Sequence, residues 1–171
     1  IPYQTGAENE LGPVVNDTYF GKVPEDRLVV KEGVMFFRAD GQYRSKIGLT
    51  PKRANSVAGS YDALNKVLTI VQYNKPVNAE DYVNSMWQLQ EEPFRGDVIN
   101  SYNDGPASPG AKPMGPFYEL ETSSPAAALP PGGSIVHIHR TFHFCGPEAQ
   151  LDAIARATLG TSLEEIKSAL P

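Results

Sequence analysis

The sequence has a single cysteine, Cys145, so it holds neither a disulfide framework nor a cysteine-based zinc module. No apolar run approaches the ~20 residues of a membrane-spanning helix, which excludes a membrane span. The 15 Lys and Arg residues are scattered and are outnumbered by 20 Asp and Glu, for a net charge of −5. A nucleic-acid partner is therefore not expected, because such partners need a concentrated basic surface.

Glycine and proline, in contrast, are abundant, with 15 of each among 171 residues. Both residues interrupt regular elements, so the composition favours short strands joined by turns over long helices. The length fits a single domain over residues 1–171. The chain begins at Ile1 without a methionine and without a signal peptide, and we expect a processed or trimmed protein of periplasmic or secreted location.

Short strand-like runs, rich in β-branched and aromatic residues, recur in the first hundred residues. The run Lys66–Tyr73 is the clearest, because it has apolar residues on both faces, as a strand covered on both sides does. Residues 103–116 are rich in Gly and Pro and predict a loop of a length that is often functional. The expected strands are 27–30, 34–38, 43–49, 66–73 and 97–102.

Alternation is stricter in the second half, over Phe117–Thr122 and Ser134–Cys145. Only the tail, residues 148–170, has a helical pattern, with Gly160 separating two short helices. These patterns predict an all-β, mainly antiparallel β-sandwich in two layers, with two short C-terminal helices. The residues expected to point inward are Leu68, Ile70, Val136, Ile138, Phe142 and Phe144.

Two glutamates, Glu119 and Glu121, fall on the same face of the strand predicted at 117–122. Two neighbouring carboxylates repel each other if both are ionised in a partly buried place, so one pKa should rise toward neutral pH. A carboxyl group tuned in this way is suited to general acid or base catalysis. The alternative is a solvent-exposed face that carries two ordinary glutamates.

All three histidines, His137, His139 and His143, fall on one face of one predicted strand. Alternate strand positions are roughly 6.5–7 Å apart, so an H-x-H pair can share a metal ion, as it does in cupin-like barrels. The glutamate that follows in cupins is missing, and a solvated or ligand-facing surface that hydrogen-bonds a polyol is the alternative. We expect no metal and no cofactor.

The segment Asn100-Ser101-Tyr102-Asn103-Asp104-Gly105, together with Trp87, combines amides, hydroxyls and aromatic rings. Amides bind ring hydroxyls in pairs, and aromatic side chains cover the apolar face of a sugar, so this composition suits carbohydrate recognition. Turn formation explains the same residues equally well, because Asn-Asp-Gly is a strong turn signal by itself.

Several motifs, taken in order, resemble the galactose mutarotase (aldose 1-epimerase) family. Tyr118–Pro125, Leu129–Gly133 and Arg140–Phe144 resemble the end of that family, and Asn16–Phe20 is similar to its Asn-His-x-Tyr-Phe element. The whole chain is similar to mutarotase-like proteins of the DUF6786 type, common in Bacteroidetes, with their Gly-Pro-Phe-Tyr-Glu-Leu-Glu-Thr-Ser-Ser-Pro signature. Mutarotase-like chains are longer, so the resemblance implies the C-terminal portion of a larger β-supersandwich.

The resemblance also implies a carbohydrate ligand and a set of site residues. Glu121 falls on the family's catalytic base, which deprotonates the anomeric hydroxyl while a histidine protonates the ring oxygen. Asp17 stands where that histidine is expected, so the acid is either Asp17, with a pKa raised by burial, or one of His137 and His139. The candidate sugar contacts are Asn16, Trp87, Asn100, Asn103, Asp104, Glu119, His137 and His143.

Three functions are therefore open. The first is a mutarotase- or epimerase-like protein that acts by acid–base catalysis at the anomeric centre of an aldose or sugar derivative. The second is a non-catalytic carbohydrate-binding domain of the same fold, and the third is a cupin-like metal-dependent enzyme that uses the three histidines. For a half-sandwich, we also expect a homo-oligomer or a missing N-terminal half to cover the sheet edges.

Overall fold

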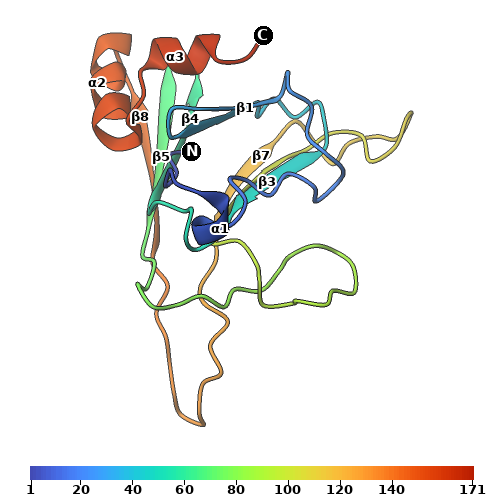
Figure 1. Cartoon of the computed structure of the whole chain (residues 1–171). Coiled ribbons are helices and arrows are strands. Elements are labelled where there is room, and N and C mark those ends of the chain that lie inside the picture. Colours follow the sequence, from blue (N-terminus) through green and yellow to red (C-terminus); the bar gives the residue numbers. More distant parts are fainter.

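A computed structural model describes the whole chain, residues 1–171 (Figure 1). It is a mainly antiparallel β structure with three helices, which confirms the predicted predominance of antiparallel strands. The strands are β1 (Leu28–Lys31), β2 (Val34–Phe37), β3 (Ser45–Leu49), β4 (Val57–Asp62), β5 (Val67–Tyr73), β6 (Ile99–Asn103), β7 (Tyr118–Thr122) and β8 (His139–Cys145). The helices are α1 (Glu8–Leu11), α2 (Glu148–Leu159) and α3 (Leu163–Ser168).

The strands form a β1-β2 hairpin and two three-stranded antiparallel sheets, β3-β6-β7 and β4-β5-β8. Strand β4 has no counterpart among the expected strands, because its sequence VAGSYD lacks a run of β-branched or aromatic residues. The four-residue helix α1 is also additional, in a stretch whose sequence shows no periodicity.

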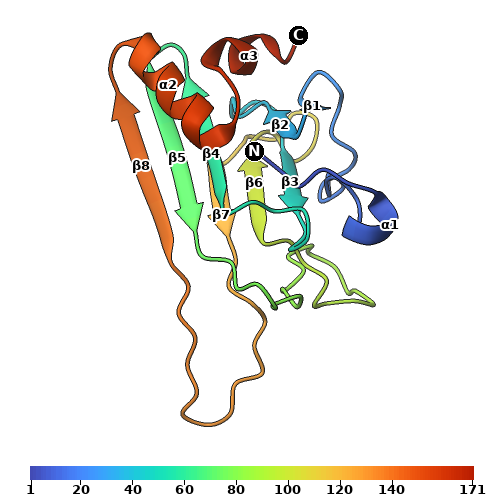
Figure 2. The same ribbon diagram turned by 60° about the vertical axis from the view of Figure 1, so that its left-hand side comes forward.

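Strand β5 is the central strand of its sheet and is buried on both faces, as its sequence predicts. On one face, Leu68 and Ile70 pack against the buried residues of α2. Figure 2 shows α2 lying against the β4-β5-β8 sheet. On the other face, Val71 and Tyr73 belong to a core shared with Leu49 of β3 and Ile99 of β6. The molecule therefore has two apolar cores, one under the helices and one between the two sheets.

The C-terminal helices begin and end as their sequence predicts. Gly160 follows α2 in the left-handed conformation, with φ of 69°, which favours glycine. Ser162 then caps α3 in a capping box, since its hydroxyl accepts from Glu165 N while the Glu165 carboxylate accepts from Ser162 N over 2.7 Å. No helix is long and apolar enough to cross a membrane.

The expected inward face of residues 134–145 is only partly found. Strand β8 begins at His139, and residues 123–138 project from the body as a long extended loop (Figures 1 and 2). Val136 is 74% exposed and Phe142 is 38% exposed, whereas Phe144 packs against the α2 core. The prediction fails here because β8 is an edge strand paired only with β5, and α2 does not extend over its beginning.

Substitutions along this face should separate its buried part from its exposed part. Ile70→Ala should lower the free energy of unfolding by about 2–5 kcal/mol, since it leaves a cavity at a side chain only 2% exposed. Val136→Ala should change it by less than about 0.5 kcal/mol, because the side chain is already in water. Urea unfolding of both variants measures the difference, and equal losses would contradict this assignment of the core.

Candidate functional site

One face of the β3-β6-β7 sheet collects most of the polar side chains singled out by the sequence. The strand register places Lys46 of β3, Tyr102 of β6 and Glu119 of β7 in one row across the sheet. The next row holds Gly48, Asn100 and Glu121, and alternation puts both rows on the same side. We call this the polar face; it lies opposite Ile47, Leu49, Ile99 and Leu120, which point the other way.

Glu121 and Glu119 differ in their electrostatic surroundings on the polar face. The Lys46 ammonium lies 2.7 Å from Glu121 Oε2, with the lysine side chain only 12% exposed. Burial, and then the neighbouring Glu121 carboxylate, raise the pKa of Glu119, while Lys46 opposes this shift. Glu119 is therefore the carboxyl group with the raised pKa, and Glu121 is the one paired with a cation.

A buried carboxylate, Asp97, organises the adjoining part of the polar face. The Tyr19 hydroxyl donates to Asp97 Oδ2 over 2.5 Å and lies 2.9 Å from Asn100 Oδ1. Asn16 Nδ2 donates to the same Asp97 oxygen over 3.1 Å. Burial raises the pKa of Asp97, although these two hydrogen bonds and the charge of Lys46 act to lower it.

Tyr19 is held in its neutral form by the same arrangement. Burial raises the pKa of its phenol well above the ordinary value, and the Asp97 carboxylate raises it further. Tyr19 also lies under a cation, because the Lys46 ammonium is 5.3 Å from the centre of its ring. The phenol is thus a fixed hydrogen-bond donor at neutral pH.

Gly48 allows Asp97 to approach the sheet. A Cβ atom at Gly48 would lie 2.1 Å from Asp97 Oδ2 and 2.7 Å from Asn100 Oδ1, so any other residue would displace both groups. Gly48 also exchanges two backbone hydrogen bonds with Asn16, of 2.8 and 2.9 Å. The segment that carries Asn16 and Tyr19 is therefore laid along β3, which brings these side chains onto the polar face.

Aromatic rings border the polar face at its other end. Tyr102 packs edge-on against Phe20 with ring centroids 5.9 Å apart, and it lies at the same distance from Phe117. The guanidinium of Arg44 lies over the Phe20 ring, 4.1 Å from its centroid. Phe20 remains 39% exposed, so part of this aromatic cluster is accessible from solvent.

Asp17 does not join Glu121. Its carboxylate is buried and pairs with the Lys22 ammonium at 2.6 Å, while its carbonyl accepts from Val23 N. The neighbouring Asn16 side chain, in contrast, reaches Asp97 on the polar face. Asp17 therefore closes the loop from 17 to 23, and the structure gives it no contact with the carboxylate expected to be the base.

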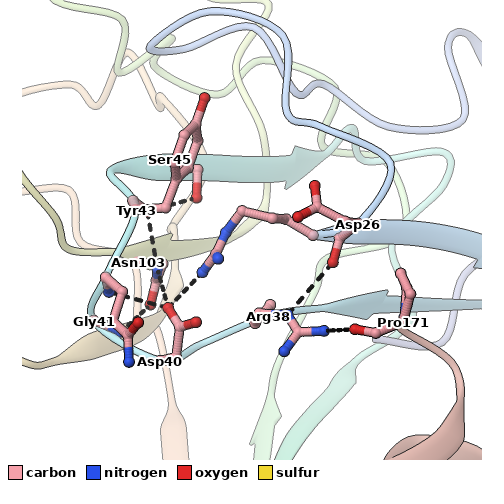
Figure 3. A network of polar contacts seen from close by, with 10 residues as sticks. Asp26, Arg38, Asp40, Gly41, Tyr43, Ser45, Asn103 and Pro171 are labelled. Carbon is pink, nitrogen blue, oxygen red and sulfur yellow. Dashed lines mark hydrogen bonds and ion pairs between the residues drawn. The ribbon is translucent and has the colours of Figure 1, made fainter.

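Asn103 and Asp104 are buried and serve loop structure. Figure 3 shows the Asn103 side chain accepting from Gly41 N over 2.8 Å and donating to the Tyr43 carbonyl over 2.9 Å. Asp104 accepts from Tyr102 and from Gly115 N, which anchors the long loop predicted at 103–116. Burial raises the pKa of Asp104, but these hydrogen bonds outweigh it and lower the pKa overall. The turn interpretation of this segment thus accounts for both side chains.

The histidines lie away from Glu121. Strand β8 pairs with β5, and both His137 Nε2 and His139 Nδ1 lie 2.8 Å from the Thr122 hydroxyl, on the opposite side of β7 from Glu121. His143 Nδ1 instead lies 3.0 Å from the Thr69 hydroxyl. Burial, and then His139, lower the pKa of His137. No group of three or more His, Cys, Asp or Glu residues is placed to hold a metal ion.

Of the remaining candidates, Asn100 lies within the polar face and Trp87 does not. Trp87 is 91% exposed on the loop between β5 and β6, and no contact ties it to the carboxylates. The structure adds Asp97, Tyr19 and Lys46, which sequence reasoning did not single out. The alternation of the strand predicted at 43–49 places Lys46 on one face, but no local signal shows that Asp97 meets Tyr19, 78 residues away.

The raised pKa of Asp97 has a consequence for stability. A carboxyl group whose pKa is higher in the folded state than in the unfolded chain adds stability below its ordinary value of 3.8. That stability is lost as the pH rises through the folded-state pKa. Relative to Asp97→Asn, the wild type should therefore gain stability on acidification, by at most ~1.4 kcal/mol per pH unit within that window.

Urea unfolding at a series of pH values measures this difference, with the exposed Asp81→Asn as a control for the change in net charge. A difference between wild type and Asp97→Asn that stays constant from pH 7 to pH 4 would contradict the assignment.

Gly48→Ala tests the close approach of Asp97 to the sheet. The added methyl group should lower the free energy of unfolding by about 1–3 kcal/mol, because Asp97 and Asn100 must both move. Gly115→Ala is the matched control, since its Cβ would meet only Phe117 Cδ1 at an ordinary 3.6 Å. Thermal unfolding compares the two variants, and an unchanged Gly48→Ala protein would show that the space beside Asp97 is not needed.

Comparisons with known proteins place the chain within one family. The model of the family of unknown function DUF6786 matches residues 1–170, nearly the whole chain. No curated protein and no solved structure matches it. The match covers both sheets, the polar face and the C-terminal helices, and it agrees with the similarity of the sequence to proteins of this type. The chain therefore belongs to the DUF6786 family.

Proposed function

We propose that the chain binds a carbohydrate on its polar face and acts on it as a mutarotase- or epimerase-like protein. The observation that carries this proposal is the pair of glutamates at alternate positions of one strand, in different electrostatic surroundings. Two carboxyl groups of unlike protonation state are what acid–base catalysis at a sugar requires. Asn100 and the neutral phenol of Tyr19 supply hydrogen-bonding groups beside them.

In this proposal Glu121 is the base and Glu119 is the acid. Glu121 takes the proton from the anomeric hydroxyl as Glu119 gives its proton to the ring oxygen, so that the ring bond breaks and a carbonyl forms. After rotation about the adjacent carbon–carbon bond, the ring oxygen attacks the other face of the carbonyl. The two protons then return to their original groups. Glu119 replaces Asp17 and His139 in this role, because those side chains are engaged elsewhere.

The fold that we propose is a mutarotase-like sandwich. Support comes from the core between the sheets, to which Ala58 and Val71 contribute from β4-β5-β8, and Leu49 and Ile99 from β3-β6-β7. The polar face is then the outer side of one layer, where Glu119 is exposed and the Glu121 side chain is 41% exposed. In the β4-β5-β8 layer, β8 keeps one edge without a partner strand, as expected for part of a larger sheet.

A second candidate is a carbohydrate-binding domain without catalysis. The ion pair between Lys46 and Glu121 favours it, because the carboxylate that must act as base is already paired with an ammonium 2.7 Å away. The cupin-like alternative finds less support, since His137 and His139 share a threonine hydroxyl and no metal-binding group is formed.

Catalysis is tested by anomer interconversion, followed by exchange NMR across common aldoses. The wild type should accelerate the reaction, and Glu121→Gln and Glu119→Gln should each slow it by about 10²-fold or more while sugar still binds. The rate should also fall as the pH rises above the raised pKa of Glu119, because the acid is then deprotonated. Glu91→Gln, at an exposed glutamate outside the polar face, is the control.

The outcomes separate the two candidates. Sugar binding by the wild type without any acceleration would support the binding domain and contradict the mutarotase-like activity. Neither binding nor acceleration with any aldose would contradict both. Loss of acceleration in Glu121→Gln together with loss of binding would show that this residue holds the sugar and is not its base.

A further inference from the structure

We propose that the polar face selects sugars that carry an anionic group, with Arg44 as the residue that determines this specificity. The inference rests on the proposed function, because it names the substrate class of the same site. It is carried by the position of the Arg44 guanidinium, by the ring that holds it in place, and by the lack of an ionic partner for it.

Arg44 lies on the polar face next to the glutamates. It immediately precedes β3, and alternation places its side chain on the same side as Lys46 and Gly48. The row that holds Lys46, Tyr102 and Glu119 is therefore the row next to Arg44, and the backbone positions of Arg44 and Lys46 are ~7 Å apart. A sugar ring placed over the two glutamates would extend toward Arg44 with one of its substituents.

The guanidinium is held by an aromatic ring and not by a carboxylate. Its carbon lies 4.1 Å from the centroid of Phe20, and Phe20 in turn packs edge-on against Tyr102. Stacking on a ring fixes the plane of the guanidinium. Tyr102 hydrogen-bonds with Arg44, and no carboxylate forms an ion pair with the guanidinium. Arg44 is half-buried, so its charge is also less hydrated than that of a fully exposed arginine.

The neighbouring cations are neutralised, and Arg44 is not. Lys46 pairs with Glu121 at 2.7 Å, Lys22 pairs with Asp17 at 2.6 Å, and Arg27 pairs with Asp40. No salt bridge in the chain includes Arg44. Asp104, which directly follows β6, already accepts hydrogen bonds from Tyr102 and Gly115.

A positioned guanidinium without a partner matches a planar anion. Its fork of donors binds a carboxylate or phosphate through two parallel hydrogen bonds, which are stronger than bonds between neutral groups. A neutral sugar would leave the charge of this guanidinium without an ionic partner in a partly desolvated place. Uronic acids and sugar phosphates share the anionic group that fits, and the experiment distinguishes them.

The test is calorimetric titration of the full chain with glucose, glucuronate and glucose 6-phosphate. For the wild type we expect glucuronate or glucose 6-phosphate to bind about tenfold or more tightly than glucose, with the advantage shrinking at high salt. The anion that gains more identifies the source of the negative charge. Arg44→Gln should remove this preference while the affinity for glucose stays within about twofold of the wild type.

Two further variants complete the design. Arg44→Lys keeps the charge and loses the planar fork, so it should retain only part of the preference. Arg140→Gln, at an exposed arginine on β8 that also forms no ion pair, is the matched control and should retain all of it. Retained glucose binding by Arg44→Gln shows that the variant is folded.

Equal affinities of the wild type for neutral and anionic sugars would overturn the inference and leave the proposed function intact. The same holds if Arg44→Gln keeps the preference for the anion. Failure of every sugar to bind the wild type would instead overturn the proposed function, and this inference with it.

Discussion

Strand β5 has apolar side chains on both of its faces, and each face needs its own cover. Helix α2 covers the face of Leu68 and Ile70, and the β3-β6-β7 sheet covers the face of Val71 and Tyr73. The packing of the β3-β6-β7 sheet against β5 decides which way the candidate site faces. Because β3-β6-β7 turns its apolar side toward β5, its other side faces outward, where Glu119 and Glu121 lie.

Within that outward face, the positions of the polar side chains depend on the buried carboxyl group of Asp97. Asp97 is kept at the sheet by hydrogen bonds from Tyr19 and Asn16, and the absence of a side chain at Gly48 makes room for it. Burial of a carboxyl group costs free energy unless hydrogen bonds compensate it, and Tyr19 and Asn16 supply these bonds. Here Asp97 joins the segment at 16–19 to β6, so that polar groups from distant parts of the sequence lie side by side.

Much of the fold could be predicted from the sequence, because alternation and capping are local signals. Lys66–Tyr73, the alternation around Glu119, and the glycine between the C-terminal helices are all of this kind. The position of the histidines could not, because it depends on which strand β8 joins; pairing with β5 takes them away from Glu121. The exposure of Val136 has the same origin, since periodicity marks a face without showing whether anything covers it.

The hydrogen bonds of Asn103 restrain the segment that precedes Arg44. The buried side-chain amide of Asn103 joins β6 to the turn at 40–43. Its oxygen accepts a hydrogen bond from Gly41 N, and this hydrogen bond is buried. Arg44 follows directly after this turn, so its backbone is tied to β6 through the hydrogen bonds of Asn103, and slow exchange of the Gly41 amide hydrogen is expected. Phe20 lies in a more exposed loop. The Arg44 guanidinium is thus attached next to a segment held by a buried amide, whereas the Phe20 ring that it covers belongs to a loop without this restraint and is 39% exposed.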